Sequence, residues 1–228
     1  MRKTVPIGPT QVDVWPKNVI LQHIDPLVCV AIFPDNDRIL KLLEEPLLQA
    51  EAKFRAQDSE QGRWIGGGGA KIRDFGSWQC PTITLLNERV KQAFMKITGA
   101  KTAHIDDVWA NVSRKGEYIG PHGHRRTEVS AVYHLLPPEP GEREQFNGAL
   151  GISDPRVQRC CPTKQGLVTS QVYPPLEPGT LVLFPSFVTH YVTPHMGEGH
   201  RISIAWNIDR NVIPGRPEDE ALLPGQGA

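Results

Sequence analysis

The sequence predicts a mainly β protein of the α+β class, in which helices near the start precede an antiparallel sandwich or barrel. From about residue 103, short apolar or alternating runs are separated by turns that contain glycine or proline, and this is the strand spacing of a sandwich or barrel. Glycine and proline each supply 21 of the 228 residues. Together they make up about 18%, against a typical level of about 12%, and a turn-rich β protein needs such residues.

Two segments before the strands have helical patterns. Residues 35–56 open with Asp and Asn capping candidates and carry leucines at helical spacing, so they predict one or two short helices with a break near Pro46. In residues 81–99 apolar side chains recur at helical spacing, and Gly99 supplies a C-terminal stop. The glycine run at 66–69 lacks the spacing of a phosphate-binding loop, and we expect a flexible loop there.

Six runs carry the strand pattern, and Pro/Gly turns at 137–141 and 174–179 join some of them. The runs are HIDDVWANVS, EVSAVYHLL, GALGI, LVTSQVY, TLVLF and ISIAWNI. We therefore expect residues 1–228 to form a single domain, with a helical front over about 1–100 and a β core over about 103–210.

Charge and hydropathy exclude several classes of function. The 25 basic and 25 acidic residues cancel, whereas coating nucleic acid or an anionic membrane requires a basic excess or stripe. The first residues lack the apolar run of a secretory signal, and no stretch of about 18 apolar residues occurs. We expect a cytoplasmic protein that binds neither nucleic acid nor membranes. The four cysteines have no C-x-x-C spacing and are expected to be reduced thiols, a vicinal Cys160–Cys161 redox pair being the alternative.

Two histidines, His122 and His124, lie two residues apart between predicted strands. In an extended segment, positions i and i+2 point to the same face, so both imidazoles can converge on one metal ion. The alternative is a surface turn in which both histidines are solvated beside Arg125 and Arg126. A third histidine, His190, follows an apolar strand, and imidazoles from separate strands with one open side describe a site for an oxygen-using Fe(II) centre.

Arg201 begins the last predicted strand. Alternation places it on one face with Ser203, Ala205 and Asn207, opposite the apolar residues of the same strand. A guanidinium beside small and polar neighbours suits a cavity that holds a carboxylate in a bidentate pair. An exposed salt bridge is the alternative reading of Arg201.

Together these features resemble a known family over roughly residues 75 to 210, the bacterial 2-oxoglutarate/Fe(II)-dependent oxygenases of the double-stranded β-helix superfamily. The motifs that carry the resemblance are Trp109-x-Asn111, Lys115-Gly116-x-Tyr118, His122-x-His124, Ser130-x-x-Tyr133, Asp154-Pro155, Pro178-Gly179-x-Leu181-x-Leu183-Phe184-Pro185-Ser186, His190 and Arg201-Ile202-Ser203.

The resemblance implies a jelly roll, or double-stranded β-helix, with iron at one mouth. It implies His122 and His190 as iron ligands and Arg201 as the residue that binds the distal carboxylate of 2-oxoglutarate. The implied enzyme is a dioxygenase that uses Fe(II), 2-oxoglutarate and O2, hydroxylates a substrate, and releases succinate and CO2.

His124 departs from the wider superfamily, which usually has Asp or Glu at this position. Either His124 completes a three-histidine metal site, or a carboxylate comes from elsewhere; Glu128 is nearest in sequence, and Asp106, Asp107 and Asp154 are more remote. Asn111 and Tyr118 are candidates for the keto-acid end of 2-oxoglutarate, while Ser203 and Asn207 are candidates for contacts beside Arg201. Trp109 and Trp206 are expected in the pocket wall or in the core.

Two other functions stay open at this point. One is a three-histidine, cupin-type dioxygenase that uses no keto acid, and the other is a non-catalytic β-barrel that binds a metal or a carboxylate. The substrate is expected to be a small molecule or a peptide side chain. The sequence also leaves a homodimer open.

Overall fold

The computed structural model describes residues 3–61, 68–124, 126–138, 146–154 and 171–213. The helices are α1 (Asn36–Gln61), the short 3-10 helix η1 (Arg73–Ser77) and α2 (Pro81–Thr98). The strands are β1 (Thr4–Ile7), β2 (Thr10–Asp13), β3 (Gln22–Asp25), β4 (Val28–Ile32), β5 (Ala70–Ile72), β6 (His104–Ser113), β7 (Ile119–His122), β8 (Val129–Leu136), β9 (Leu150–Ser153), β10 (Gln171–Val172), β11 (Thr180–Pro185), β12 (His190–Val192) and β13 (Arg201–Asp209).

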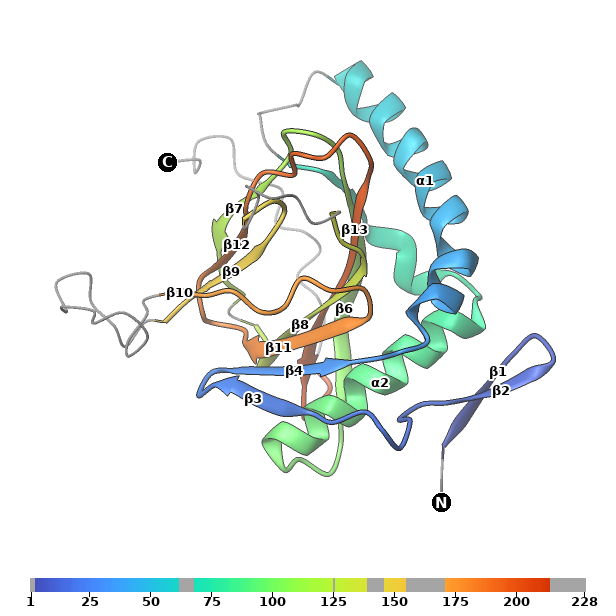
Figure 1. Cartoon of the computed structure of the whole chain (residues 1–228), viewed down its shortest axis with the longest axis vertical. Helices are drawn as coiled ribbons and strands as arrows, with labels where there is room; N and C mark the ends of the chain where they lie inside the picture. The colour runs from blue at the N-terminus through green and yellow to red at the C-terminus, as the bar shows by residue number, and fades with distance from the viewer. Residues whose placement is uncertain (1–2, 62–67, 125, 139–145, 155–170, 214–228) are drawn as a thin grey trace, which may run out of the picture.

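Two antiparallel sheets face each other. The larger has the order β3-β4-β11-β8-β13-β6-β5, and the smaller has the order β10-β9-β12-β7. Strands β1 and β2 form a separate hairpin. In Figure 1, α1 and α2 lie on one side of the large sheet, and β7, β9 and β12 lie on the other. This arrangement confirms the predicted jelly roll with supporting helices.

The two faces of the large sheet bury two different cores. On β13, Ile202, Ile204, Trp206 and Ile208 are completely buried in the core that the sheet shares with α1 and α2. The opposite face packs against the small sheet through a smaller apolar cluster that includes Val182, Phe184, Leu150 and Ile152. The predicted alternation along β13 is therefore confirmed, and it directs Arg201 and Ser203 between the sheets.

The expected break of the first helix at Pro46 does not occur. A single helix, α1, runs through Pro46, although proline removes a backbone donor and costs about 3 kcal/mol in a helix interior. Leu43 and Leu47 on either side of it are both buried to 1% or less. Burying one leucine contributes about 1.5–3 kcal/mol, so the packing of the apolar stripe outweighs the cost of Pro46.

The front of the chain is less helical than predicted. Strand β4 pairs with β11, and β5 pairs with the far end of β6, so early residues complete both edges of the large sheet. Strands β4 and β11 are about 150 residues apart in the sequence, and β5 and its partners in β6 are about 40 apart. A local sequence pattern carries little information about such distant partners. The second helix is as predicted, because α2 ends where Gly99 adopts φ 70°.

Most of the predicted strands are confirmed. The second part of GALGI forms β9, and the described part of LVTSQVY contains β10, while its first four residues lie outside the described residues. The vicinal pair Cys160–Cys161 lies outside the described residues. Cys29 and Cys80 are free thiols, and burial raises the pKa of Cys29 to about 11. In the described part of the chain, no helix combines the length and the apolar character needed to cross a bilayer.

Candidate active site

Three histidines converge at one mouth of the β core. His122 ends β7 and His190 begins β12, and the two residues are direct partners in the antiparallel register. His124 follows β7, where its backbone N–H donates to the Ser186 carbonyl (2.7 Å). The rings of His122 and His190 lie 4.2 Å apart between centroids, and His124 is 5.2 Å from each. One ligand atom from each side chain lies within 4.8 Å of the others, a spacing that suits a shared metal ion.

Two of these imidazoles are oriented by the same local hydrogen bond. Nδ1 of His122 lies 2.9 Å from the Gly120 carbonyl, and Nδ1 of His190 lies 3.0 Å from the Val188 carbonyl. A carbonyl can only accept, so Nδ1 carries a proton in both rings, and in the neutral form of each ring the lone pair is on Nε2. Such a hydrogen bond sets the tautomer and the ring orientation of a metal-binding histidine.

The charge state also suits a metal. Burial, with smaller effects of the His122 and Lys71 charges, lowers the pKa of His124 to about 4. Burial also lowers the pKa of His190 to about 4, against a raising effect of its Val188 hydrogen bond. Both imidazoles are therefore neutral at pH 7, as a metal ligand must be.

None of the carboxylates considered as a further metal ligand belongs to the histidine cluster. Glu128 forms a two-point ion pair with Arg210 (2.5 and 2.6 Å), and Asp106 pairs with Arg126 at 3.1 Å. Asp107 and Asp154 are not among the clustered ligands. Within the described ranges, the three histidines form the only group of three or more metal-binding side chains.

A cavity of about 220 Å³ opens between the sheets beside His122 and His190. Its wall includes Asn111, Ser203, Lys71, Trp109, Gly68, Gly69, Ile119, Val132, Leu150, Val192 and Ala205. Pockets for drug-sized ligands measure about 300–1,000 Å³, so this cavity suits a smaller molecule. Two predicted cosubstrate contacts, Asn111 and Ser203, therefore lie in the wall.

The other two predicted contacts lie outside the cavity wall. Tyr118 precedes Ile119 and is 41% exposed. Asn207 accepts a hydrogen bond from the Ser130 hydroxyl (3.0 Å), which also contacts the Ser186 hydroxyl (3.0 Å). Roles for Tyr118 and Asn207 in binding 2-oxoglutarate stay predictions.

Arg201 is completely buried at the start of β13. Its Nε donates to the Gly148 carbonyl (2.8 Å) and its Nη1 donates to the Ser203 hydroxyl (3.1 Å). Its Nη2 is buried and has no hydrogen-bond partner in the described part of the chain. Burial lowers the pKa of Arg201 to about 10, so the guanidinium is still charged at pH 7. A buried cation with one unused donor fits an anionic ligand, which excludes the surface salt bridge.

Gly148 provides the room for this guanidinium. A Cβ at this position would lie 2.8 Å from Cδ of Arg201, and the backbone has φ +57°, which disfavours other residues. Replacement of Gly148 is therefore expected to displace the Arg201 side chain.

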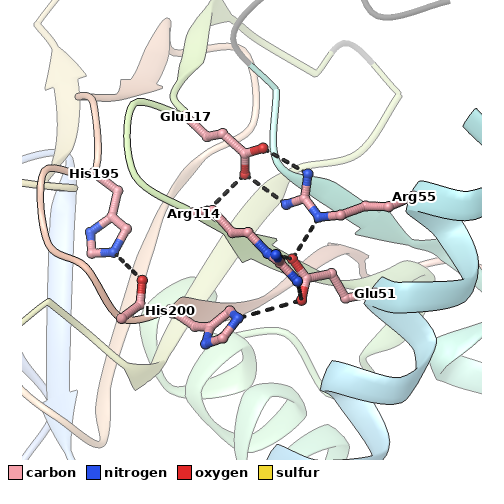
Figure 2. A network of polar contacts seen from close by, with 7 residues as sticks. Glu51, Arg55, Arg114, Glu117, His195 and His200 are labelled. Carbon is pink, nitrogen blue, oxygen red and sulfur yellow. Dashed lines mark hydrogen bonds and ion pairs between the residues drawn. The ribbon is translucent and has the colours of Figure 1, made fainter. Parts of the chain in front are cut away.

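A network of ion pairs braces the segments next to Arg201 (Figure 2). Glu51 of α1 is 1% exposed, and its carboxylate contacts Arg55 Nε (2.7 Å), Arg114 Nε (2.7 Å) and His200 Nε2 (3.6 Å). Arg55 also pairs with Glu117 (2.8 Å). Arg114 follows Ser113, the register partner of Arg201, and His200 precedes Arg201. Glu51 therefore holds α1 against the end of β6 and the start of β13.

A double-stranded β-helix with a three-histidine centre and a buried arginine defines a class of candidate metal-dependent oxygenases. Residues 107–207 match the sequence model of the family described as "Putative 2OG-Fe(II) oxygenase". This match confirms the resemblance expected from the sequence. The matched segment lies in the β core, which is therefore similar in sequence to the 2OG-Fe(II) oxygenases.

Solved structures share the fold. AviO1 from Streptomyces viridochromogenes Tue57 aligns with a TM-score of 0.56 at 15% identity, over 84% of this chain and 93% of AviO1. HygX from Streptomyces hygroscopicus, solved with nickel and 2-oxoglutarate bound, aligns with a TM-score of 0.51 at 9% identity, over 79% and 81%.

A third structure is a 2OG-Fe(II) oxygenase family oxidoreductase from Burkholderia pseudomallei. It aligns with a TM-score of 0.42 at 18% identity, over 58% of this chain and 59% of that protein. No curated protein matches the sequence.

The sequence assigned no role to three residues that lie in or beside the cavity wall. Lys71 lies 4.1 Å from the centroid of the Trp109 ring, and both line the cavity; nothing in the sequence near Lys71 indicates this contact. Gly69 packs against the Val112 carbonyl, where a Cβ would approach to 2.6 Å. His134 is the third, and the alternation in EVSAVYHLL already places it on the same face as Ser130 and Val132.

Proposed function

We propose that this protein is an Fe(II)- and 2-oxoglutarate-dependent dioxygenase that hydroxylates a small molecule or a peptide side chain. The observation that carries the proposal is the pairing, in one fold, of three clustered imidazoles with a buried arginine that has an unused donor. When bound, Fe(II) and 2-oxoglutarate supply the oxidising chemistry with O2, and the cosubstrate is converted to succinate and CO2.

The chain's own residues have distinct tasks. His122, His124 and His190 hold the metal, His122 and His190 through Nε2 atoms that their Nδ1 hydrogen bonds leave available. Arg201 binds the distal carboxylate of 2-oxoglutarate, with Ser203 orienting one guanidinium nitrogen. The apolar side chains of Val132, Leu150 and Val192 exclude water from the cavity wall, which strengthens the charge interactions inside it.

A shell of three histidines has one negative charge fewer than the usual shell of two histidines and one carboxylate. Fe(II) is therefore expected to bind more weakly than in a site with two histidines and a carboxylate. Nitrogen ligands favour Ni(II), Cu(II) and Zn(II) over Fe(II). We expect purified protein to carry one of these metals unless iron is supplied.

The test is anaerobic spectroscopy of metal-free protein reloaded with Fe(II) and then titrated with 2-oxoglutarate. We expect a visible charge-transfer band that disappears in His190→Ala and weakens in Arg201→Ala. His23→Ala, which removes an exposed histidine on β3, is the matched control and should keep the band. A wild-type protein that binds iron without developing a band would refute the proposal.

The keto-acid-free alternative predicts a different result. A cupin-type dioxygenase would consume O2 with its substrate whether or not 2-oxoglutarate is present, and Arg201→Ala would leave this uptake unchanged. The buried, unused Nη2 of Arg201 favours the keto-acid enzyme, because burying a charged donor without a partner is costly. Succinate release measured against O2 uptake separates the two.

A further inference from the structure

A second buried nitrogen without a partner among the described residues lies close to Arg201. His134 of β8 is 1% exposed, and its Nε2 has no hydrogen-bond partner in the described part of the chain. More than about 90% of buried polar groups in proteins are satisfied, and each one left unpaired costs about 1–3 kcal/mol. Two such atoms on neighbouring residues indicate a ligand that both would contact.

The strand geometry places His134 and Arg201 behind the cavity wall, on either side of the wall residue Ser203. Ser203 and Val132 line the cavity. His134 is the register partner of Ser203 across the β8–β13 pair, and it lies two residues beyond Val132 on the same face of β8. Arg201 lies two residues before Ser203 on the same face of β13 and donates Nη1 to the Ser203 hydroxyl. The two unpaired nitrogens therefore belong to residues on either side of Ser203.

The charge state of His134 also suits an anionic ligand shared with Arg201. Burial, together with the nearby Arg201 charge, lowers the pKa of His134 to about 3, so its ring is neutral at pH 7. A neutral imidazole can stay beside a guanidinium without repulsion, and its N–H tautomer at Nε2 is a hydrogen-bond donor. An anionic group with two oxygens would accept one hydrogen bond from each residue.

We propose that His134 is a further cosubstrate-binding residue, whose Nε2–H donates to the same distal carboxylate that Arg201 binds. This inference rests on the proposed function, because it takes 2-oxoglutarate as the ligand. His134 would make the site selective for keto acids that carry a second carboxylate. Its contribution is a single hydrogen bond and involves no proton transfer.

The experiment is anaerobic calorimetric titration of the Fe(II)-loaded protein with two keto acids. 2-Oxoglutarate carries the distal carboxylate, and 2-oxopentanoate has a methyl group in its place. His134→Leu should weaken 2-oxoglutarate binding at least tenfold, because a hydrogen bond to a charged group is lost, and leave 2-oxopentanoate binding unchanged. His134→Gln, which retains an N–H donor, should recover most of the affinity.

Tyr133→Phe is the matched control. Tyr133 is the preceding residue on β8, is equally buried, and also has an unpaired polar atom, but its side chain packs in the core on the helix side of the sheet. Its replacement should leave both titrations unchanged. Equal 2-oxoglutarate affinity in His134→Leu and wild type would overturn the proposal, and so would equal weakening of both keto acids.

Nuclear magnetic resonance of 15N-histidine-labelled wild type tests the inference without any substitution, and it uses Zn(II) in place of paramagnetic iron. The Nε2 resonance of His134 should report a protonated nitrogen that shifts on addition of 2-oxoglutarate and not of 2-oxopentanoate. An unprotonated Nε2 in the complex overturns the inference. Wild type that binds neither keto acid refutes the proposed function itself, whereas binding that depends on Arg201 and not on His134 refutes only the role of His134.

Discussion

Replacement of Glu51 by glutamine tests the ion-pair network beside Arg201. Glutamine has nearly the same shape as glutamate, so the change removes the charge and directs an amide N–H toward Arg55 or Arg114. Breaking a buried ion pair by removing one partner costs about 3–5 kcal/mol. The cost should be lower here, because Arg114 is 53% exposed and Arg55 keeps its pair with Glu117.

We therefore expect Glu51→Gln to lower the free energy of unfolding by about 2–3 kcal/mol. For a chain of this size, 1 kcal/mol corresponds to about 2–4 °C in melting temperature, so the expected decrease is about 4–12 °C. Thermal and urea unfolding at pH 7.5 measure it. Glu45→Gln, an exposed site on the same helix, is the matched control and should stay within about 0.5 kcal/mol of wild type.

The pH dependence identifies the charge as the cause. Burial acts to raise the pKa of Glu51, but hydrogen bonds and charges from Arg114 and Arg55 outweigh it and lower the pKa below 4.5. A carboxyl whose pKa is lower in the folded state stabilises the fold above its unfolded pKa, and this contribution is lost as the pH falls through the folded value. The difference between wild type and Glu51→Gln should be constant above about pH 5.5 and shrink below about pH 4.5. A difference that does not shrink as the pH falls below about 4.5, or a variant as stable as wild type at pH 7.5, would show that the reasoning is wrong.

Two substitutions test how the core and its turns position the site. Gly179→Ala should lower the free energy of unfolding, measured by urea titration, by more than about 1 kcal/mol, because φ is +82° and a Cβ would lie 2.3 Å from the Phe33 carbonyl. Gly99→Ala, which is also at positive φ but in open space, should cost less in the same titration. Trp206→Phe should cost about 2–4 kcal/mol by calorimetry, since it opens a cavity and leaves the Asn87 side chain without its 2.8 Å hydrogen bond. A cost below 0.5 kcal/mol for either substitution would contradict the packing described.

Local patterns were enough to predict the chemistry-bearing strands. The alternation in ISIAWNI placed Arg201 and Ser203 on one face of a strand, because one face of that strand is apolar and the period of a strand is two residues. The spacing of His122 and His124 indicated a shared face for the same reason. The expectation of a break at Pro46 was wrong because the apolar stripe of α1 extends past that residue on both sides.

The tertiary structure decided what these residues meet. His190 pairs in register with His122, 68 residues earlier in the chain. Glu51 contacts Arg114 and His200 from a helix whose own sequence indicates only packing. That Nε2 of His134 has no hydrogen-bond partner in the described part of the chain is known only once its surroundings are known. The sequence by itself determined the β core and which side chains share a face, because these depend on neighbours one to four positions away. The three-histidine cluster, the cavity and the unpaired nitrogens of Arg201 and His134 depend on contacts between distant segments, which no local period encodes.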